Sequence, residues 1–243
     1  MVALPERFDP TLAAMDAEME RRAAEQPPRS YLGASQIGEA CERKLWYSIQ
    51  PGIARERFNA ATLRRFEDGH RSEDVMIKRL RMVSGVELHT VDETGQQFGF
   101  SDLAGRFKGH VDGLMRGILQ APETDHVWEA KCVNEKKFAE FQKLKTSVGE
   151  KATLSEWDAV YYAQAIVYMH YFDMKRHYLV VMTPGARDHA SCRTDANPEM
   201  AQALRAKAKR ILDATKPPAR LSERPEFWKC KMCQFRSVCH AAT

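Results

Sequence analysis

The chain has 243 residues, of which 44% are hydrophobic and 29% charged, so it can bury one full core like an ordinary globular protein. Its net charge of +4 suits a polyanionic partner without requiring one. No apolar run approaches about 18 residues and no secretory signal pattern opens the chain, so we expect no membrane association and a cytoplasmic location. Six cysteines in such a protein indicate bound metal or buried thiols in preference to disulfides.

Residues 1–29 are predicted to form an N-terminal helical arm, and residues 30–243 a single domain. Leu12, Met15 and Met19 recur at helical spacing on one side, and a pair of prolines ends the helix. The arm could bind a partner or pack against the body of the protein, and packing is the simpler expectation.

Two more helices are predicted before the pattern changes. Ser35 is a candidate cap for a short helix that carries Cys41. A longer helix is predicted over about 59–82, and His70 and Glu73 interrupt its apolar side. Polar side chains in an apolar stripe need partners, because burying them alone is costly.

From residue 86 the periodicity becomes that of strands. Four strands are predicted, at 86–91, 96–101, 106–115 and 126–133. A polar, lysine-rich helix or loop, an apolar helix over 155–172, a strand over 177–183 and a helix over 198–215 follow. Strands that succeed one another through short turns favour an α/β fold of the α+β kind, with a central mixed sheet flanked by helices.

Two acidic segments indicate a catalytic site. If the strands that carry Asp112 and Glu129 pair, their carboxylates could bind one hard cation, with the carbonyl of Ala130 as a further ligand. Lys131 faces the same side as Glu129, because residues two apart in a strand share a face. There it could orient water or stabilise negative charge in a transition state. A surface ion pair across two strands is the simpler alternative.

Two helices could complete this site. Tyr161, Gln164 and Tyr168 lie on one face of the apolar helix, where a neighbouring active site would supply partners; the alternative is a core helix whose edge reaches solvent. His70 and Glu73 could approach from the long helix, either as a third metal ligand or as a residue that contacts a metal ligand. For His70, a solvated helix face is an equal alternative.

The cysteines near the end of the chain form the most specific pattern. Cys230, Cys233 and Cys239 place three thiols within ten residues, a spacing that suits zinc or an iron–sulfur cluster. His240 would complete a zinc site. Cys41 would instead complete a site of four thiolates and would join the N-terminal helix to the C-terminal tail.

Together these segments resemble the PD-(D/E)xK nuclease superfamily, and within it the RecB-like exonucleases that carry an iron–sulfur cluster, among them CRISPR-associated and phage enzymes. The resemblance spans about residues 30–240. It rests on Cys41 with the basic and aromatic residues after it, Gly69 to Glu73, Gly109 to Gly113, Glu129 to Lys131, Gln164 to Tyr168, and Cys230, Cys233 and Cys239. Glu73 stands where the family usually has histidine, which leaves the third ligand open between Glu73 and His70.

The resemblance implies a restriction-endonuclease-like core, Mg²⁺ or Mn²⁺ as catalytic metal and a structural 4Fe–4S cluster on the four cysteines. The predicted function is a metal-dependent DNA exonuclease that acts on single strands or duplex ends. Its catalytic residues would be Asp112, Glu129, Lys131, Gln164 and Tyr168. Arg43, Lys44, Lys136 and Tyr161 are candidate DNA contacts, with a solvated charged surface as the alternative for each charged residue.

The resemblance also suggests a bacterial or phage-encoded protein, with phage recombination or CRISPR adaptation as the setting and source of protein partners. Two alternative functions remain at this stage. One is an endonuclease or DNA-end processing nuclease within a complex. The other is a non-catalytic DNA-binding module with a structural metal–thiol clamp, although the intact Asp112, Glu129 and Lys131 set argues against it.

Overall fold

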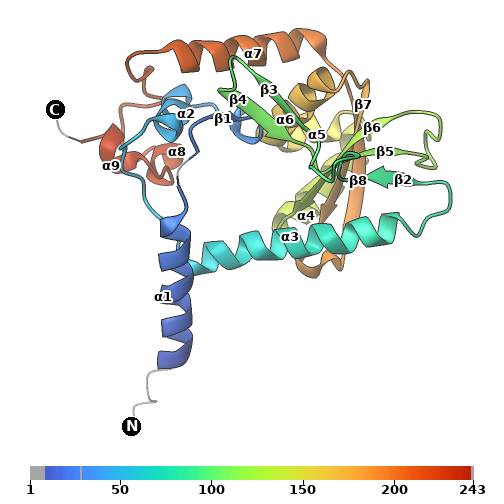
Figure 1. The fold of residues 1–243 in the computed structure, drawn as a ribbon, viewed down its shortest axis with the longest axis horizontal. Coiled ribbons are helices and arrows are strands. Elements are labelled where there is room, and N and C mark those ends of the chain that lie inside the picture. Colours follow the sequence, from blue (N-terminus) through green and yellow to red (C-terminus); the bar gives the residue numbers. More distant parts are fainter. Residues whose placement is uncertain (1–8, 28, 242–243) are drawn as a thin grey trace.

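The computed structural model describes residues 9–27 and 29–241 and has an α/β fold in which helices flank two sheets (Figure 1). In chain order the elements are α1 (Pro10–Glu25), β1 (Leu32–Gly33), η1 (Ala34–Gln36), α2 (Glu42–Ile49), α3 (Ala60–Leu80), β2 (Glu87–His89), β3 (Gly99–Asp102), β4 (Phe107–His110), β5 (Gly113–Arg116), β6 (His126–Cys132), α4 (Glu135–Val148), α5 (Thr153–Trp157), α6 (Ala159–Tyr171), β7 (Arg176–Met182), η2 (Pro184–Ala186), β8 (His189–Asp195), α7 (Pro198–Asp213), α8 (Trp228–Lys231) and α9 (Arg236–Cys239).

The larger sheet has five strands in the order β2-β5-β6-β7-β8. Its central pair, β6 and β7, is parallel and the other neighbours are antiparallel, so the sheet is mixed. This confirms the predicted class, a mixed sheet flanked by helices. A second sheet of three strands, β1-β4-β3, was not predicted.

The predicted strand over 106–115 is two strands, β4 and β5, which belong to different sheets. The chain turns between them at Val111 and Asp112. Glycines on either side allow close packing: an added Cβ at Gly109 would lie 2.6 Å from the Tyr168 ring, and one at Gly113 would lie 2.8 Å from Leu88. The prediction of one continuous strand was therefore wrong, and the turn places Asp112 between the two sheets.

Two predicted helix starts also differ from the structure. Ser35 lies inside η1, whereas Cys41 is the N-cap of α2, its sulfur accepting the Lys44 N–H at 3.4 Å. The apolar helix predicted from residue 155 is divided at Asp158, whose extended backbone ends α5. The Asp158 carboxylate then caps α6 by accepting two backbone N–H groups.

Strand β8 was not predicted, although residues 177–183 before it were. Its buried residues are Cys192 and Thr194, which alternate with charged or small side chains. The strand has the period of two, but it lacks the bulky apolar residues from which strands are usually recognised. Pairing with β7 over seven residues therefore stabilises β8 as a strand, although its composition does not predict one.

The first helix projects from the body (Figure 1). None of its residues is buried. It contacts α3, where Glu20 accepts the Ala60 N–H at 2.8 Å and Asp16 pairs with Arg64. Residues 1–8 and 28 of the predicted arm lie outside the described residues, and the division into an arm and one domain stays a prediction.

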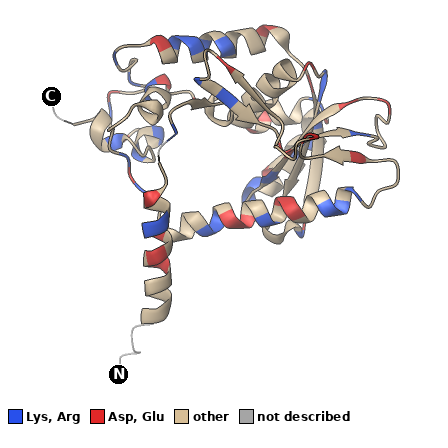
Figure 2. Ribbon diagram, viewed as in Figure 1, with Lys and Arg blue, Asp and Glu red and all other residues tan. Residues whose placement is uncertain are grey.

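The core forms around α6, in which residues 163–169 are all buried. This helix packs against α7, η1 and the central strands β6 and β7. Acidic and basic residues alternate along the exposed length of α3 (Figure 2). Within the described ranges, no helix combines the length and apolar character needed to cross a membrane.

Candidate active site

The turn between β4 and β5 positions Asp112 beside β6. The pairing of β5 with β6 ends at Gly113 opposite Trp128, so the next part of β6 has no strand partner on that side. There the Ala130 N–H donates to Asp112 Oδ2 at 2.9 Å. The Asp112 carboxylate therefore accepts a backbone hydrogen bond that a neighbouring strand would otherwise accept. This bond holds Asp112 against β6, beside the Glu129–Lys131 segment.

Glu129 and Lys131 form a buried ion pair on β6. Lys131 Nζ lies 2.6 Å from Glu129 Oε2 and 4.0 Å from Asp112 Oδ2, and the Glu129 residue is only 1% exposed. Glu129 Oε1 is buried and has no hydrogen-bond partner among the described residues. A buried carboxylate oxygen without a partner is costly, so the site favours a further positive group there.

Two tyrosines of α6, Tyr161 and Tyr168, lie near this ion pair, and Gln164 contacts Tyr168. Gln164 Nε2 donates to the Tyr168 hydroxyl at 3.2 Å, and both side chains are buried. The Tyr161 ring centroid lies 5.5 Å from Lys131 Nζ. Burial, followed by the charge on Glu129, raises the pKa of the Tyr168 hydroxyl, so Tyr168 stays a neutral hydrogen-bonding group.

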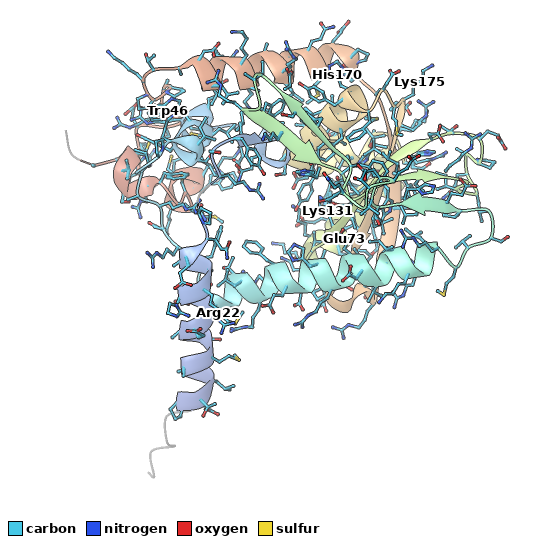
Figure 3. The ribbon with its side chains drawn as sticks, in the orientation of Figure 1. Arg22, Trp46, Glu73, Lys131, His170 and Lys175 are labelled. Atoms are coloured by element: carbon cyan, nitrogen blue, oxygen red, sulfur yellow. The ribbon has the colours of Figure 1, made fainter. Side chains whose placement is uncertain are left out.

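The long helix α3 brings Glu73 to the same place but not His70. Glu73 lies near Lys131 (Figure 3), and burial together with the charge on Asp112 raises the pKa of Glu73 to about 7. His70 is exposed and borders a shallow pocket of about 370 Å³ with Met19 and Arg22 of α1. Of the two candidate third ligands, Glu73 is the one beside Asp112.

The charges in the site depend on one another. Burial and the charge of Asp112 raise the pKa of Glu129, and the charge of Lys131 opposes this rise. Burial alone would lower the pKa of Lys131, but Glu129 and Asp112 outweigh it and raise that pKa. Lys131 therefore stays protonated, and burial makes ionisation of the Glu73 and Glu129 carboxyls less favourable than in water.

The candidate DNA contacts have different surroundings. Arg43 donates to the Pro218 carbonyl at 3.0 Å, which ties α2 to the segment after α7. Lys44 pairs with Glu39, and Lys136 is exposed on α4. Their role toward DNA stays a prediction.

Lys137, the next residue on α4, was not among the candidates. Its Nζ lies 2.6 Å from Asp158 and 4.7 Å from the Tyr161 ring centroid. Its position in the lysine-rich segment was the available signal, but the sequence did not show which lysine points toward α6.

Four of the six cysteines line one cavity of about 550 Å³: Cys41, Cys230, Cys233 and Cys239. His240, whose buried Nε2 has no hydrogen-bond partner in the part of the chain that the structure describes, lines it too. In residues 9–27 and 29–241, however, no three His, Cys, Asp or Glu side chains converge as the ligands of a metal ion would. The structure thus brings the predicted thiols to one cavity and leaves the predicted cluster itself a proposal.

The donor groups present fit the implied ions by their chemistry. Asp112, Glu129 and Glu73 offer hard carboxylate oxygens, which suit Mg²⁺ or Mn²⁺. One of them, the buried Oε1 of Glu129, has no hydrogen-bond partner within the described ranges. The cavity offers soft thiols and an imidazole nitrogen, which suit iron–sulfur clusters or zinc.

Solved structures share this arrangement of helices and strands. The crystal structure of SSO0001 aligns over 96% of this chain and 97% of its own, with a TM-score of 0.51 and 16% identity. The alkaline exonuclease LHK-Exo of Laribacter hongkongensis aligns over 81% and 90%, with a TM-score of 0.50 and 15% identity. The chain has an exonuclease-like fold. LHK-Exo in complex with dAMP aligns over 75% of this chain and 86% of that one, with a TM-score of 0.50 and 17% identity.

At these identities the likeness concerns the fold alone. No protein-family model matches the chain, and no curated protein matches it by sequence. Assignment of chemistry to this exonuclease-like fold therefore depends on the residues of the site itself.

Proposed function

We propose that the protein is a metal-dependent DNA exonuclease. The observation that carries the proposal is the grouping of Asp112, Glu129 and Lys131 at the turn from one sheet to the other. The exonuclease-like fold supports it, and the dAMP complex of LHK-Exo supports DNA as the substrate class. An ion pair with only a structural role would not require a second carboxylate from the turn between β4 and β5.

Asp112 and Glu129 are the proposed metal ligands, with Glu73 as the third. The carbonyl of Ala130 remains a further candidate, and His70 is the less favoured alternative to Glu73. When bound, Mg²⁺ or Mn²⁺ supplies the positive charge that activates water for attack on a phosphodiester. The two carboxyls with raised pKa values lose their protons as the cation binds, so affinity for the metal increases with pH.

Lys131 is the proposed electrostatic catalyst. Its ammonium group is held between two carboxylates and stays charged, so it can neutralise negative charge that develops on the phosphate. Gln164 and Tyr168, which hydrogen-bond to each other, would orient the lysine or the DNA backbone. The Tyr161 ring, whose centroid lies 5.5 Å from Lys131 Nζ, would stabilise the same positive charge.

The cysteines are proposed to hold a structural 4Fe–4S cluster, with Cys41 joining Cys230, Cys233 and Cys239. Zinc, with His240 as a ligand, is the alternative. In either case ligation would connect α2 to the C-terminal helices and would stabilise the fold without taking part in hydrolysis.

The test is digestion of end-labelled linear DNA and of closed circular DNA with Mn²⁺. We expect the wild type to degrade only the linear DNA. Asp112→Asn should lower the rate by about 100-fold or more, because one anionic ligand is lost. Asp125→Asn, which removes an exposed carboxylate that pairs with Arg116, is the matched control and should keep full activity.

Asp112 suits this test better than Lys131. Loss of Lys131 would leave the buried Glu129 without its counter-charge, and a slower enzyme could then reflect an altered fold. Full activity of purified Asp112→Asn would contradict the site assignment. Cuts within circular DNA would favour an endonuclease, and binding without cleavage a non-catalytic module.

A further inference from the structure

The long helix α3 connects two parts of the molecule, and its middle lies in solvent. It contacts α1 near its start, and β6 and η2 further along (Figure 1). Between these contacts, residues 64–71 are exposed except for Gly69, which is half-buried. Two turns of helix therefore present a surface instead of packing on the core.

Two phenylalanines lie exposed at this surface. Phe66 belongs to the exposed turns and Phe58 to the segment before α3, and the two residues are 47% and 45% exposed. Both line a cavity of about 580 Å³, and no cysteine is among the described residues that line it. A single exposed apolar side chain is ordinary, but two neighbouring rings at one cavity form a surface that can accept a ligand.

The two rings hold each other in a fixed arrangement. Their centroids are 5.1 Å apart and their planes meet at 89°, so the edge of one ring packs on a face of the other. This contact covers one of the four ring faces, and nearly half of each residue remains open to solvent. A pair oriented in this way suits a planar group that stacks on a ring.

The pair lies on the same side of α3 as the proposed metal ligand. Phe66 and Glu73 are seven positions apart, so their directions differ by only about 20° and their distance along the helix is about 10 Å. Glu73 is beside Asp112 in the candidate active site. At a rise of about 3.4 Å per nucleotide, a DNA strand with one phosphate at the carboxylates would reach the rings within about three nucleotides.

The chain next to both rings supplies positive charge. Arg55 and Arg57 line the same cavity, Arg65 directly precedes Phe66, and all three are exposed. Within the described part of the chain, none of the three forms an ion pair, unlike their neighbours on α3. Of the two acidic residues that line the cavity, Glu20 and Glu56, Glu20 already accepts a backbone N–H of α3. The arginine charge is thus available to a phosphate backbone.

We propose that Phe58 and Phe66 form a stacking site for unpaired bases of single-stranded DNA, with Arg55 and Arg57 as contacts to its phosphates. This assignment rests on the proposed nuclease function. An apolar peptide would use the rings but not the arginines, and an acidic peptide the arginines but not the rings. A single strand uses both, because its base faces are free to stack, whereas those of a duplex are covered by neighbouring bases.

The test measures binding of DNA without cleavage. In the Asp112→Asn background without added divalent metal, the fluorescence anisotropy of a labelled oligo-dT of about 15 nucleotides gives the Kd. Phe66→Ala should weaken binding about 5- to 100-fold, the loss expected for one stacked base, and Phe66→Trp should retain the affinity. Leu119→Ala, which shortens another exposed apolar side chain, is the matched control and should change nothing.

Two further variants separate stacking from apolar bulk and from charge. Phe66→Leu keeps an apolar side chain without a ring and should bind oligo-dT as weakly as Phe66→Ala. An oligonucleotide made of abasic sites has the same backbone without bases, so Phe66→Ala should leave its affinity unchanged. Arg57→Ala should weaken binding of both oligonucleotides by the same factor and reduce the slope of log K against log salt by about 0.7.

Two results would overturn the stacking site. One is unchanged oligo-dT affinity in Phe66→Ala, and the other is an equal loss of affinity for abasic or duplex DNA. The thermal melting temperature of Phe66→Ala should stay close to that of the parent, because Phe66 lies outside the core. Binding that depends on Phe66 in a protein that digests no DNA would reject only the nuclease function. Digestion by the wild type together with unchanged binding in Phe66→Ala would reject only the stacking site.

Discussion

At the scale of single residues, the long helix shows why spacing alone left the third ligand open. Positions three apart on a helix differ by about 300° in direction, so His70 and Glu73 project within about 60° of each other. Packing of α3 on the sheet turns Glu73 toward Asp112 and leaves His70 beside α1. A rotation too small for a sequence pattern to specify decides between them.

A buried histidine on β7 gives a pH prediction at the same scale. His177 is 1% exposed, neither ring nitrogen has a hydrogen-bond partner among the described residues, and burial, followed by the charge of Lys131, lowers its pKa to about 3. The unfolded chain, with an ordinary pKa near 6.5, binds a proton that the folded protein does not. Stability is therefore fully present above pH 6.5 and falls as the pH decreases from there toward 3.

Replacing this histidine should remove that dependence. Below pH 6.5 the wild type should lose up to about 1.4 kcal/mol of unfolding free energy per pH unit through this group, and His177→Gln should lack that component. Urea denaturation of both proteins from roughly pH 8 to pH 5 measures the difference in slope. Parallel curves for the two proteins would show that His177 is not a buried neutral group.

At the scale of elements, the turn between β4 and β5 depends on space beside its glycines. A Cβ at Gly109 would lie 2.6 Å from Tyr168 and 2.8 Å from Ala34. Gly109→Ala should therefore lower the unfolding free energy by about 1–3 kcal/mol, as overpacking does, and displace Tyr168 from Gln164. Urea denaturation measures the first effect, and the rate of DNA digestion should fall with the second.

The matched control is Gly69→Ala on α3. A Cβ there meets nothing within 4 Å, and alanine favours a helix over glycine by up to about 1 kcal/mol. This variant should be as stable as the wild type or slightly more so. A loss of stability in Gly69→Ala equal to that in Gly109→Ala would show that the close approach to Tyr168 is not the cause.

At the scale of the whole molecule, two distant parts of the chain meet around one cavity. Cys41 begins α2, and three cysteines follow from α8 onward, so a metal bound by all four would close a loop of nearly the entire domain. In the described residues the four thiols line this cavity, but no three of the side chains that could bind a metal ion are grouped as its ligands would be. Binding of the metal would then bring the four thiols together and order this region.

Removal of one thiol should therefore affect metal content and stability together. Cys41→Ala should lose most of the iron, or zinc if zinc is bound, and should melt at a lower temperature than the wild type because the connection between α2 and the tail is lost. Metal analysis, visible absorbance and thermal melting provide the measurements. Cys132→Ala, which alters a thiol on β6 away from the cavity, should retain its metal. Equal metal content in the two variants would exclude Cys41 as a ligand.

The sequence by itself determined the class of fold and the composition of the candidate site. Hydrophobic period predicted α3, β6, β7 and α7, because each buries one regular face. The acidic pattern selected residues that meet beside β6, and the thiol pattern selected residues that line one cavity. It could not predict the second sheet, the division at Asp158 or β8, since these depend on pairing between distant segments rather than on local pattern.

Only the tertiary structure decided how those residues meet. The turn at Asp112, the choice of Glu73 over His70 and the contact of Lys137 with two aromatic rings all depend on how α3, α4 and α6 pack against β6. The physical reason is range: a side chain's type and period are local properties. The partner that offsets its burial lies on another element and is fixed only when the core closes.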